Sequence, residues 1–234
     1  MINNKKILAI IPARGSSKGV PRKNIKELNG RPLIAYTIEE AKKSKYIDRI
    51  VVSTEDTEIA EVSKMFMAEI PCLRPLELAN DDTPTIDCVI HMLNLLKDNE
   101  NYTPDYVCLL QCTSPLRTVD DIDGTIDKLI TTGMDGAVSI CEAEVNPYWT
   151  NVFVGNRLQY FFKEGKKITR RQDLPKIYRL NGAVYVAKSD VLQKERTFET
   201  DKVTGYVMSC ERSIDIDTEF DFNIANLLLK NKKI

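Results

Sequence analysis

The stretch IPARGSSKGVPRKN, residues 11–24, combines glycine, serine and basic side chains in one short loop. It follows an apolar run at residues 6–11 that has the character of a buried β-strand. Gly15 and Gly19 allow backbone N–H groups to approach an anion. Positive charge for a polyphosphate comes from Arg14, Lys18, Arg22 and Lys23. We therefore expect a triphosphate-binding loop at the carboxyl end of the first strand.

The spacing of this loop differs from two common phosphate-binding motifs. A dinucleotide-binding loop needs GxGxxG, and a P-loop needs GxxxxGK followed by Ser or Thr; neither string occurs in the sequence. An ordinary basic surface loop is the alternative interpretation, because charged runs often only keep a turn solvated. The other motifs of the sequence are needed to distinguish a phosphate-binding loop from an ordinary surface loop.

Two aspartates near the carboxyl end of the chain form a second chemical signal. Asp215 and Asp217 alternate with Ile214 and Ile216, so at strand spacing both carboxylates would project to one side. Close to a triphosphate, such a pair is suited to Mg²⁺, which takes few carboxylates and fills its octahedron with waters and phosphate oxygens. The alternative is an edge strand with a solvated acidic face.

Other catalytic arrangements find little support in the sequence. His91 is the only histidine, so neither a Ser-His-Asp triad nor a multi-histidine metal site can be built. Its position between Ile90 and Leu93 favours a structural histidine on a helix. Cys112 has no histidine paired with it, and we do not expect it to act as a nucleophile.

The elements that must position these residues follow a repeating pattern. Strands are predicted at residues 6–11, 49–53, 106–110, 136–141 and 181–187, and helical periods run through residues 34–41, 59–66, 86–96, 122–130 and 220–228. Thr118 is placed to cap the helix that follows it. Such βαβ repetition predicts an α/β fold with a mainly parallel sheet covered on both faces.

The alternation of predicted strands and helices is interrupted in residues 145–175, which we call the arm. Residues 152–154 and 158–162 flank a Gly155-Asn156 turn and predict a hairpin. The adjacent aromatic residues of the arm, Tyr160, Phe161 and Phe162, need a partner to cover them, and a subunit contact is the natural one. We expect a single domain over residues 1–234 with this arm as an insertion, and a homodimer.

Composition excludes several classes of protein. The 33 basic residues nearly cancel the 34 acidic ones, so no global field attracts nucleic acid or an anionic membrane. The six cysteines contain no CxxC pair, which is typical of a reducing compartment. The apolar run at residues 7–11 is too short for a signal sequence or a membrane span. We expect a cytoplasmic protein that binds its anions locally.

Five ordered segments together resemble one known family. They read IPARGSSKGVPRKN, RPLELANDDTPTID, LLQCTSPLR, RRQDLPKIYRLNGAVYV and SIDIDTEFDF. The chain is similar to the acylneuraminate cytidylyltransferases, the CMP-sialic acid synthetases, and to their relatives that activate legionaminic or pseudaminic acid, over residues 6–229. The resemblance implies a Rossmann-like three-layer α/β/α fold of the nucleotide-diphospho-sugar transferase type. It also implies Mg²⁺, with CTP and a nonulosonic acid as substrates.

The resemblance assigns the phosphate contacts position by position. The implied contacts with the CTP phosphates are Arg14, Ser16, Ser17, Lys18, Lys23 and Asn24. Lys23 falls on the family's lysine near the α-phosphate, and Arg14 falls on the arginine that neutralises pyrophosphate. Both are candidate catalytic residues.

Cytosine would be recognised at Arg74 and by small residues beyond it, Thr83 and Thr85. Here the chain departs from the family, because Asp82 to Thr85 replace the commoner TASS-like string. Without the family, Arg74 and Pro75 could equally form a simple turn.

For the sugar acid, the resemblance implies Gln111, Arg171, Arg179, Asn181 and Tyr185. The planar fork of arginine suits the carboxylate of such a substrate, although either arginine could instead form a structural ion pair. Arg171 follows the arm and could act in the neighbouring subunit's site. Cys112 stands where family members usually have proline.

The metal-binding aspartates of the family align with Asp215 and Asp217, and the candidate general base is Asp217 or a metal-bound hydroxide. The implied reaction is attack of the anomeric hydroxyl on the α-phosphorus of CTP with loss of pyrophosphate, helped mainly by positioning and charge neutralisation. A nucleotidyltransferase that uses UTP or GTP with a sugar 1-phosphate is an alternative. A nucleotide-sensing domain without turnover is another. The sequence does not identify which nonulosonic acid is used.

Overall fold

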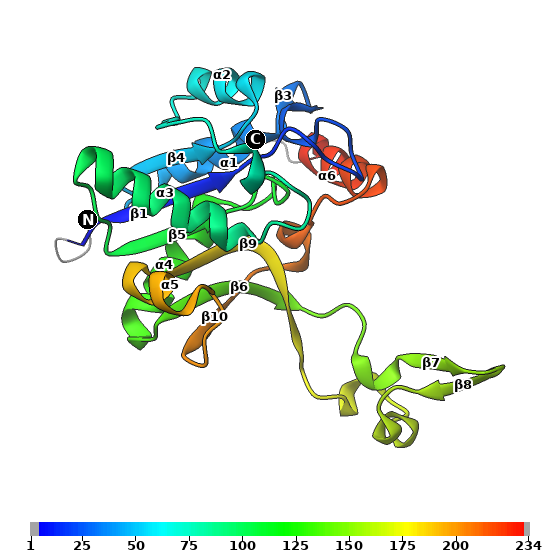
Figure 1. Ribbon diagram of the computed structural model, residues 1–234. Coiled ribbons are helices and arrows are strands. Elements are labelled where there is room, and N and C mark those ends of the chain that lie inside the picture. Colours follow the sequence, from blue (N-terminus) through cyan, green and yellow to red (C-terminus); the bar gives the residue numbers. More distant parts are fainter. Residues whose placement is uncertain (1–4, 232–234) are drawn as a thin grey trace.

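The computed structural model describes residues 5–231 and is built around a six-stranded sheet (Figure 1). The strands, in spatial order, are β10 (Val203–Val207), β6 (Gly136–Glu142), β9 (Tyr178–Lys188), β5 (Tyr106–Leu110), β1 (Ile7–Pro12) and β4 (Arg49–Ser53). Among these strands, β9 alone runs antiparallel to its neighbours. The prediction of a mainly parallel sheet is therefore confirmed.

Helices cover both faces of the sheet. On one face lie α1 (Leu33–Lys43), α2 (Thr57–Met65) and α4 (Val119–Thr132), and on the other lie α3 (Thr85–Glu100) and α5 (Ser189–Glu195). The strand residues alternate between the two cores: Ile7 and Ala9 pack under α1 and α4, whereas Leu8 and Ile10 pack against α3. This arrangement confirms the predicted three-layer α/β/α fold.

The helix α4 shows why the predicted helices form where they do. Its apolar residues Ile122, Ile126 and Leu129 recur at helical spacing and are all buried. At its start, the Thr118 N–H donates to Asp121 Oδ2 over 3.0 Å in a capping box. Such a cap contributes about 1 kcal/mol, and the predicted role of Thr118 is confirmed.

A third, smaller core brings the two ends of the chain together. The short strands β2 (Glu27–Leu28) and β3 (Arg31–Pro32) follow the basic loop, and α6 (Glu219–Asn231) packs beside them. Val20 and Leu28 from the first region are buried against Ile216 and Phe222 from the second. This core holds the basic loop against the segment that carries the two aspartates.

The expectation of a strand at residues 214–217 is wrong. The segment is extended but lies outside the sheet, between the 3-10 helix η6 (Cys210–Ser213) and α6. The Ile216 N–H donates to the Thr113 carbonyl over 2.8 Å, and its side chain is buried in the third core. A backbone contact with a loop, rather than a strand ladder, therefore fixes the two aspartates.

The arm extends away from the sheet (Figure 1). Its hairpin consists of β7 (Asn151–Val154) and β8 (Arg157–Tyr160), with Gly155 at a φ of 60° in the turn. The flanking 3-10 helices are η3 (Pro147–Trp149), η4 (Lys163–Lys167) and η5 (Arg171–Asp173). Phe153 and Phe161 are 76% and 62% exposed, so the arm presents an uncovered apolar surface. None of the helices in the described part of the chain is long and apolar enough to cross a membrane.

Candidate active site

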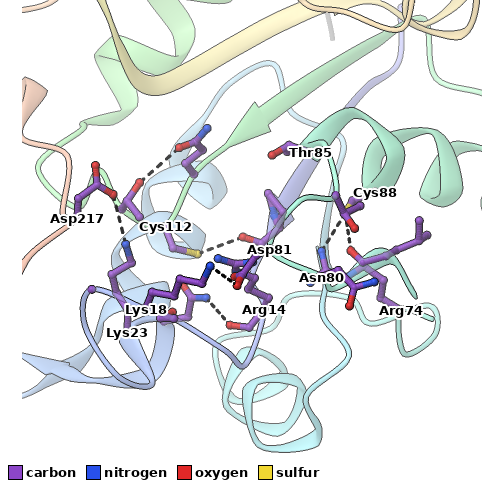
Figure 2. A pocket seen from close by; sticks show the side chains of 18 residues that line it. Arg14, Lys18, Lys23, Arg74, Asn80, Asp81, Thr85, Cys88, Cys112 and Asp217 are labelled. Atoms are coloured by element: carbon purple, nitrogen blue, oxygen red, sulfur yellow. Dashed lines mark hydrogen bonds and ion pairs between the residues drawn. The ribbon is translucent and has the colours of Figure 1, made fainter. Parts of the chain in front are cut away.

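A cleft of about 410 Å³ opens at the carboxyl ends of β1 and β5. β4, the next strand of the main sheet along the chain, pairs with one side of β1, and β5 pairs with the other. At such a switch point the loops leave in opposite directions and a crevice forms between them. Figure 2 shows Lys23 and Asp217 at one end of this cleft, Arg14, Lys18 and Asp81 near its middle, and Arg74 at the other end.

The basic loop lines the middle of the cleft, and an aspartate balances its charge. Arg14 Nη1 lies 2.7 Å from Asp81 Oδ1, and Lys18 Nζ lies 2.6 Å from Asp81 Oδ2. The hydrogen bond from Lys18 and the charge of Arg14 keep the pKa of Asp81 below its ordinary value. Two cations that share one partly exposed carboxylate form a site that a more highly charged anion can occupy.

Two glycines let this loop lie close to its neighbours. A Cβ atom on Gly19 would fall 1.9 Å from the Asp217 carbonyl oxygen, so a larger residue would push the loop away from the aspartate segment. The Gly15 N–H donates to Glu55 Oε1 over 2.7 Å. The glycines therefore allow close backbone packing. The N–H of Gly15 donates to the Glu55 carboxylate and not toward the cleft.

Lys23 and Asn24 belong to the 3-10 helix η1 (Lys23–Ile25) at the end of the loop. The Lys23 ammonium donates to the Ile216 carbonyl over 2.5 Å and lies 3.7 Å from Asp217 Oδ1. Buried Asn24 donates through Nδ2 to the Arg14 carbonyl over 2.9 Å. Asn24 therefore shapes the loop, while Lys23 places its charge beside the aspartates.

The other residues of the loop separate into two groups. Ser17 lines the cleft, whereas Ser16 is exposed and does not. Arg22 pairs with Asp56 and Glu58 outside the cleft lining. The general expectation that every cation of the loop serves the phosphates thus does not hold for Arg22 in this conformation, because two carboxylates of the neighbouring segment already bind it.

Arg74 closes the far end of the cleft. Its side chain is 4% exposed, with Nη2 2.7 Å from Glu55 Oε2 and Nη1 3.0 Å from Cys88 Sγ. Thr83 and Thr85 line the same end of the cleft. Because Glu55 also accepts from Gly15 of the basic loop, it links the middle of the cleft to its Arg74 end.

Gln111 and Thr113 line the cleft directly after β5, and Cys112 lies between them. Burial raises the pKa of the Cys112 thiol to about 12, so it stays protonated at neutral pH, in agreement with its rejection as a nucleophile. Buried Arg117 holds this loop by donating to the Gln111 and Ala183 carbonyls over 3.1 and 2.7 Å. His91 lies in α3 and does not line the cleft.

The two aspartates differ in environment although they lie close together. Asp215 is largely buried, which raises the pKa of its carboxyl group, and the charge of Asp217 raises it further. Its Oδ1 has no hydrogen-bond partner among residues 5–231, while the side chain of Asp217 is 78% exposed and points toward Lys23 (Figure 2). A buried oxygen without a partner beside a second carboxylate fits a divalent cation.

The residues predicted from β9 do not line the cleft. Arg179 forms a two-point ion pair with Glu144 at 3.0 and 2.7 Å, and Asn181 is buried, accepting from Ser139 Oγ over 2.6 Å and donating to Ser213 Oγ over 2.9 Å. Tyr185 packs its ring 5.9 Å from that of Phe198. Arg171 borders a second cavity at the base of the arm. The structure thus brings the nucleotide set together but leaves these four apart from it.

Sequence reasoning missed several residues of the cleft. Asn80, Asp81 and Cys88 line it, and Glu55 links the basic loop to Arg74. Asp81 could have been noticed, because it belongs to the RPLELANDDTPTID segment and is an acid opposite a basic loop. Glu55 had no comparable signal: only the pairing of β4 with β1 places it beside Gly15.

This fold, with a cleft and a basic loop at the carboxyl ends of its strands, is typical of nucleotide-binding α/β proteins. The family model described as Cytidylyltransferase matches residues 8–234. The chain belongs to the cytidylyltransferase family, and the predicted resemblance is confirmed.

Individual relatives agree with this assignment. The chain is 34% identical to a CMP-N,N'-diacetyllegionaminic acid synthase of Legionella pneumophila, over 96% of this chain and 97% of the relative. It is likewise 34% identical to a pseudaminic acid cytidylyltransferase of Campylobacter jejuni, with the same coverage. The fold matches a CMP:2-keto-3-deoxy-manno-octonic acid synthetase solved with CTP at a TM-score of 0.72 and 17% identity, over 97% of this chain and 99% of that one.

Proposed function

We propose that this enzyme transfers CMP from CTP to the anomeric hydroxyl of a nonulosonic acid and releases pyrophosphate. The observation that carries the proposal is the arrangement of one cleft, in which Lys23 of the basic loop lies beside Asp217, two residues from the buried Asp215. Relatives named for the activation of legionaminic and pseudaminic acid support the class of substrate. The fold neighbour solved with CTP supports a nucleotide in this fold.

In this proposal the triphosphate displaces Asp81 and takes over its two cations. Arg14 and Lys18 then neutralise the β- and γ-phosphates, which leave as pyrophosphate, and Ser16, Ser17 and Asn24 belong to the same phosphate-binding loop. Lys23 stabilises charge on the α-phosphate during in-line displacement. The protein needs no covalent intermediate, because positioning and charge neutralisation suffice.

Asp215 and Asp217 are the residues that would hold a divalent cation, which we propose to be Mg²⁺. Once bound, the ion supplies positive charge to the phosphate oxygens. The buried Oδ1 of Asp215 supports this assignment, since a bound cation would supply the partner that this oxygen lacks among the described residues. Asp217 is more exposed and lies closer to Lys23, so it is our candidate for accepting the proton of the attacking hydroxyl.

We place the cytosine at the opposite end of the cleft, beside Arg74, Thr83 and Thr85. The Arg74 guanidinium is already occupied by Glu55 and Cys88. Its role in this proposal is therefore to fix the wall of the base pocket, while the two threonines offer hydroxyl groups to the base edge.

The sugar acid would lie beside Gln111, next to the aspartates. Gln111 lines the cleft, and its Oε1 and Asp215 Oδ2 would each lie 3.3 Å from a Cβ placed on Gly182, so Gln111 and Asp215 flank the same narrow space. Arg171 and Arg179 are proposed to bind the carboxylate, and Asn181 and Tyr185 to support this side of the pocket from β9. Arg179 must then leave Glu144, and Arg171 must come from a second subunit.

A homodimer in which the arms of two copies exchange contacts is the assembly we propose. The exposed Phe153, Leu158 and Phe161 need cover, and Arg171 lies at the base of the same arm. The free cysteines support the cytoplasm as the compartment.

The decisive experiment offers the purified protein a choice of substrates with Mg²⁺. CTP, UTP and GTP are each combined with N-acetylneuraminic acid, legionaminic acid, pseudaminic acid or glucose 1-phosphate, and released pyrophosphate is measured. We expect release only with CTP and a nonulosonic acid. Release only with UTP or GTP and glucose 1-phosphate would identify the alternative nucleotidyltransferase. CTP binding without any product would identify a nucleotide sensor, and the relative initial rates with the three acids identify the preferred substrate.

A further inference from the structure

Three ligand-type side chains meet at the base of the arm, outside the candidate active site. The sulfur atoms of Cys141 and Cys210 and a carboxylate oxygen of Glu144 all lie within 4.8 Å of one another. Within residues 5–231, no other group of three Cys, His, Asp or Glu side chains is arranged in this way. The sequence shows no sign of the cluster, because the two cysteines are far apart along the chain.

The fold explains why these residues meet. The parallel strands β6 and β10 end side by side, with Val207 opposite Ile140, so Cys141 and the η6 turn lie at the same edge. The Met208 N–H continues this contact by donating to the Ile140 carbonyl over 2.8 Å. Cys210 Sγ lies 3.6 Å from the Glu142 carbonyl oxygen, and Glu144 follows where β6 leaves the sheet toward the arm.

The surroundings hold the three ligands in place. Cys141 is fully buried, while Cys210 and Glu144 are exposed, so an ion can enter from solvent toward a fixed inner sulfur. Ser213 in the η6 turn accepts from Asn181 over 2.9 Å and donates to the Ser209 carbonyl over 2.7 Å, which fixes the turn. Arg179 orients the Glu144 carboxylate through two hydrogen bonds, as outer partners of metal ligands do.

Ligand type and charge both favour a thiophilic divalent ion. Two thiolates and a carboxylate, with a water as fourth ligand, make a tetrahedral zinc site, in which sulfur ligands are about 3.8 Å apart for Zn–S bonds of about 2.3 Å. The required shift from the observed separations is small. Three negative ligands balance a divalent ion plus the adjacent Arg179, so binding leaves no net buried charge.

We propose that Cys141, Glu144 and Cys210 form a binding site for a thiophilic divalent cation such as Zn²⁺. Binding deprotonates the two thiols and releases their protons to solvent. The ion links the end of β6 to the η6 turn, which leads directly into Asp215 and Asp217. It therefore braces the base of the arm and the segment that carries the aspartates. It also keeps the Glu144 carboxylate bound when Arg179 leaves it for the sugar acid in the function proposed above.

A disulfide between Cys141 and Cys210 is the competing outcome. Both cysteines are free thiols in the structure, and a disulfide between them would leave the nearby Glu144 carboxylate unexplained. A metal site with two thiolates needs at least one further ligand, and the Glu144 carboxylate lies within 4.8 Å of both sulfur atoms. Its position therefore favours a bound ion over a disulfide.

The test titrates the full-length protein, kept reduced with a phosphine, with Cd²⁺ and follows thiolate-to-cadmium charge-transfer absorbance. We expect saturation at one ion per chain, displacement by Zn²⁺, and no effect of Mg²⁺ at the same concentration. Cys210→Ser should abolish most of the signal, and Glu144→Gln should weaken binding by about tenfold. Cys72→Ser is the matched control, because Cys72 lies outside the cluster and should leave the titration unchanged.

Cys210 is exposed, so its substitution is expected to leave the fold intact, and circular dichroism of each variant checks this. As a second readout, Zn²⁺ should slow alkylation of Cys210 at least tenfold in the wild type and much less in Glu144→Gln. An unchanged cadmium titration in folded Cys210→Ser overturns the proposal. So does an air-oxidised Cys141–Cys210 peptide in mass spectrometry combined with no cadmium signal from the reduced protein.

Discussion

The two halves of the proposed substrate site differ in how ready they are to bind. In the nucleotide half, Arg14 and Lys18 face the cleft and share only Asp81, a partly exposed carboxylate that an incoming phosphate can replace. In the sugar-acid half, Arg179 is held by Glu144, whose pKa falls to about 2 through that hydrogen bond. On the function proposed above, one chain would build the nucleotide site, whereas the sugar-acid site would need Arg179 to move and a second copy to supply Arg171.

The largest effect is expected at the aspartate that joins the two halves. Asp215→Asn keeps the shape of the side chain but removes the buried negative charge, so kcat should fall on the order of a thousandfold and more Mg²⁺ should be needed. Initial rates of pyrophosphate release across a Mg²⁺ series measure both effects. Glu219→Gln is the control, since this exposed carboxylate pairs with Lys26 and should not alter the Mg²⁺ dependence. Equal Mg²⁺ curves for Asp215→Asn and the wild type would remove the metal role.

The nucleotide half can be tested with two neighbouring cations of one loop. Lys23→Gln should lower kcat about a hundredfold, because the proposed donor to the α-phosphate is lost. Arg22→Gln should change kcat less than threefold, since Arg22 pairs with Asp56 and Glu58 and does not line the cleft. Steady-state kinetics with CTP compares the two variants directly. Similar losses in both would mean that the loop acts through its total charge and that Lys23 has no special position.

The proposed contribution of a second copy to the sugar-acid half can be tested by a substitution in the arm. Phe161→Asp places a charge on an exposed aromatic residue of the arm, so the dimer should dissociate. We expect KM for the sugar acid to rise about tenfold, as carboxylate binding loses Arg171, with CTP affinity almost unchanged. Sedimentation velocity and separate KM measurements report the two effects. A wild type that is monomeric at micromolar concentration would contradict the shared site.

The smallest effect is expected at Asp81. Asp81→Asn removes the anion that competes with the triphosphate, so KM for CTP should decrease about twofold to threefold, a modest change because the ion pairs are partly exposed. The difference in KM for CTP between Asp81→Asn and the wild type should be largest at low ionic strength, where screening of charges is weak. A rise in KM would instead show that Asp81 helps to position the nucleotide.

The basic loop at the end of the first strand was predictable from sequence because its residues are local. The basic loop, the glycines and the strand that precedes them form one continuous segment, and backbone geometry alone places such a loop at a sheet edge. The β9 residues were harder to place. Asn181 follows the strand pattern, but only the packing of β6 and η6 shows that its side-chain amide hydrogen-bonds with Ser139 and Ser213.

By itself, the sequence determined the alternation of strands and helices, the capped start of α4 and the composition of the phosphate loop. These features depend on hydrophobic period, turn chemistry and residues that are near neighbours in the chain. Only the tertiary structure decided that Asp217 faces Lys23, that Arg22 turns away from the cleft, and that Cys141, Glu144 and Cys210 meet. Each of these contacts joins segments that are distant in the chain, and their distances are set by strand order and core packing, which no local pattern records.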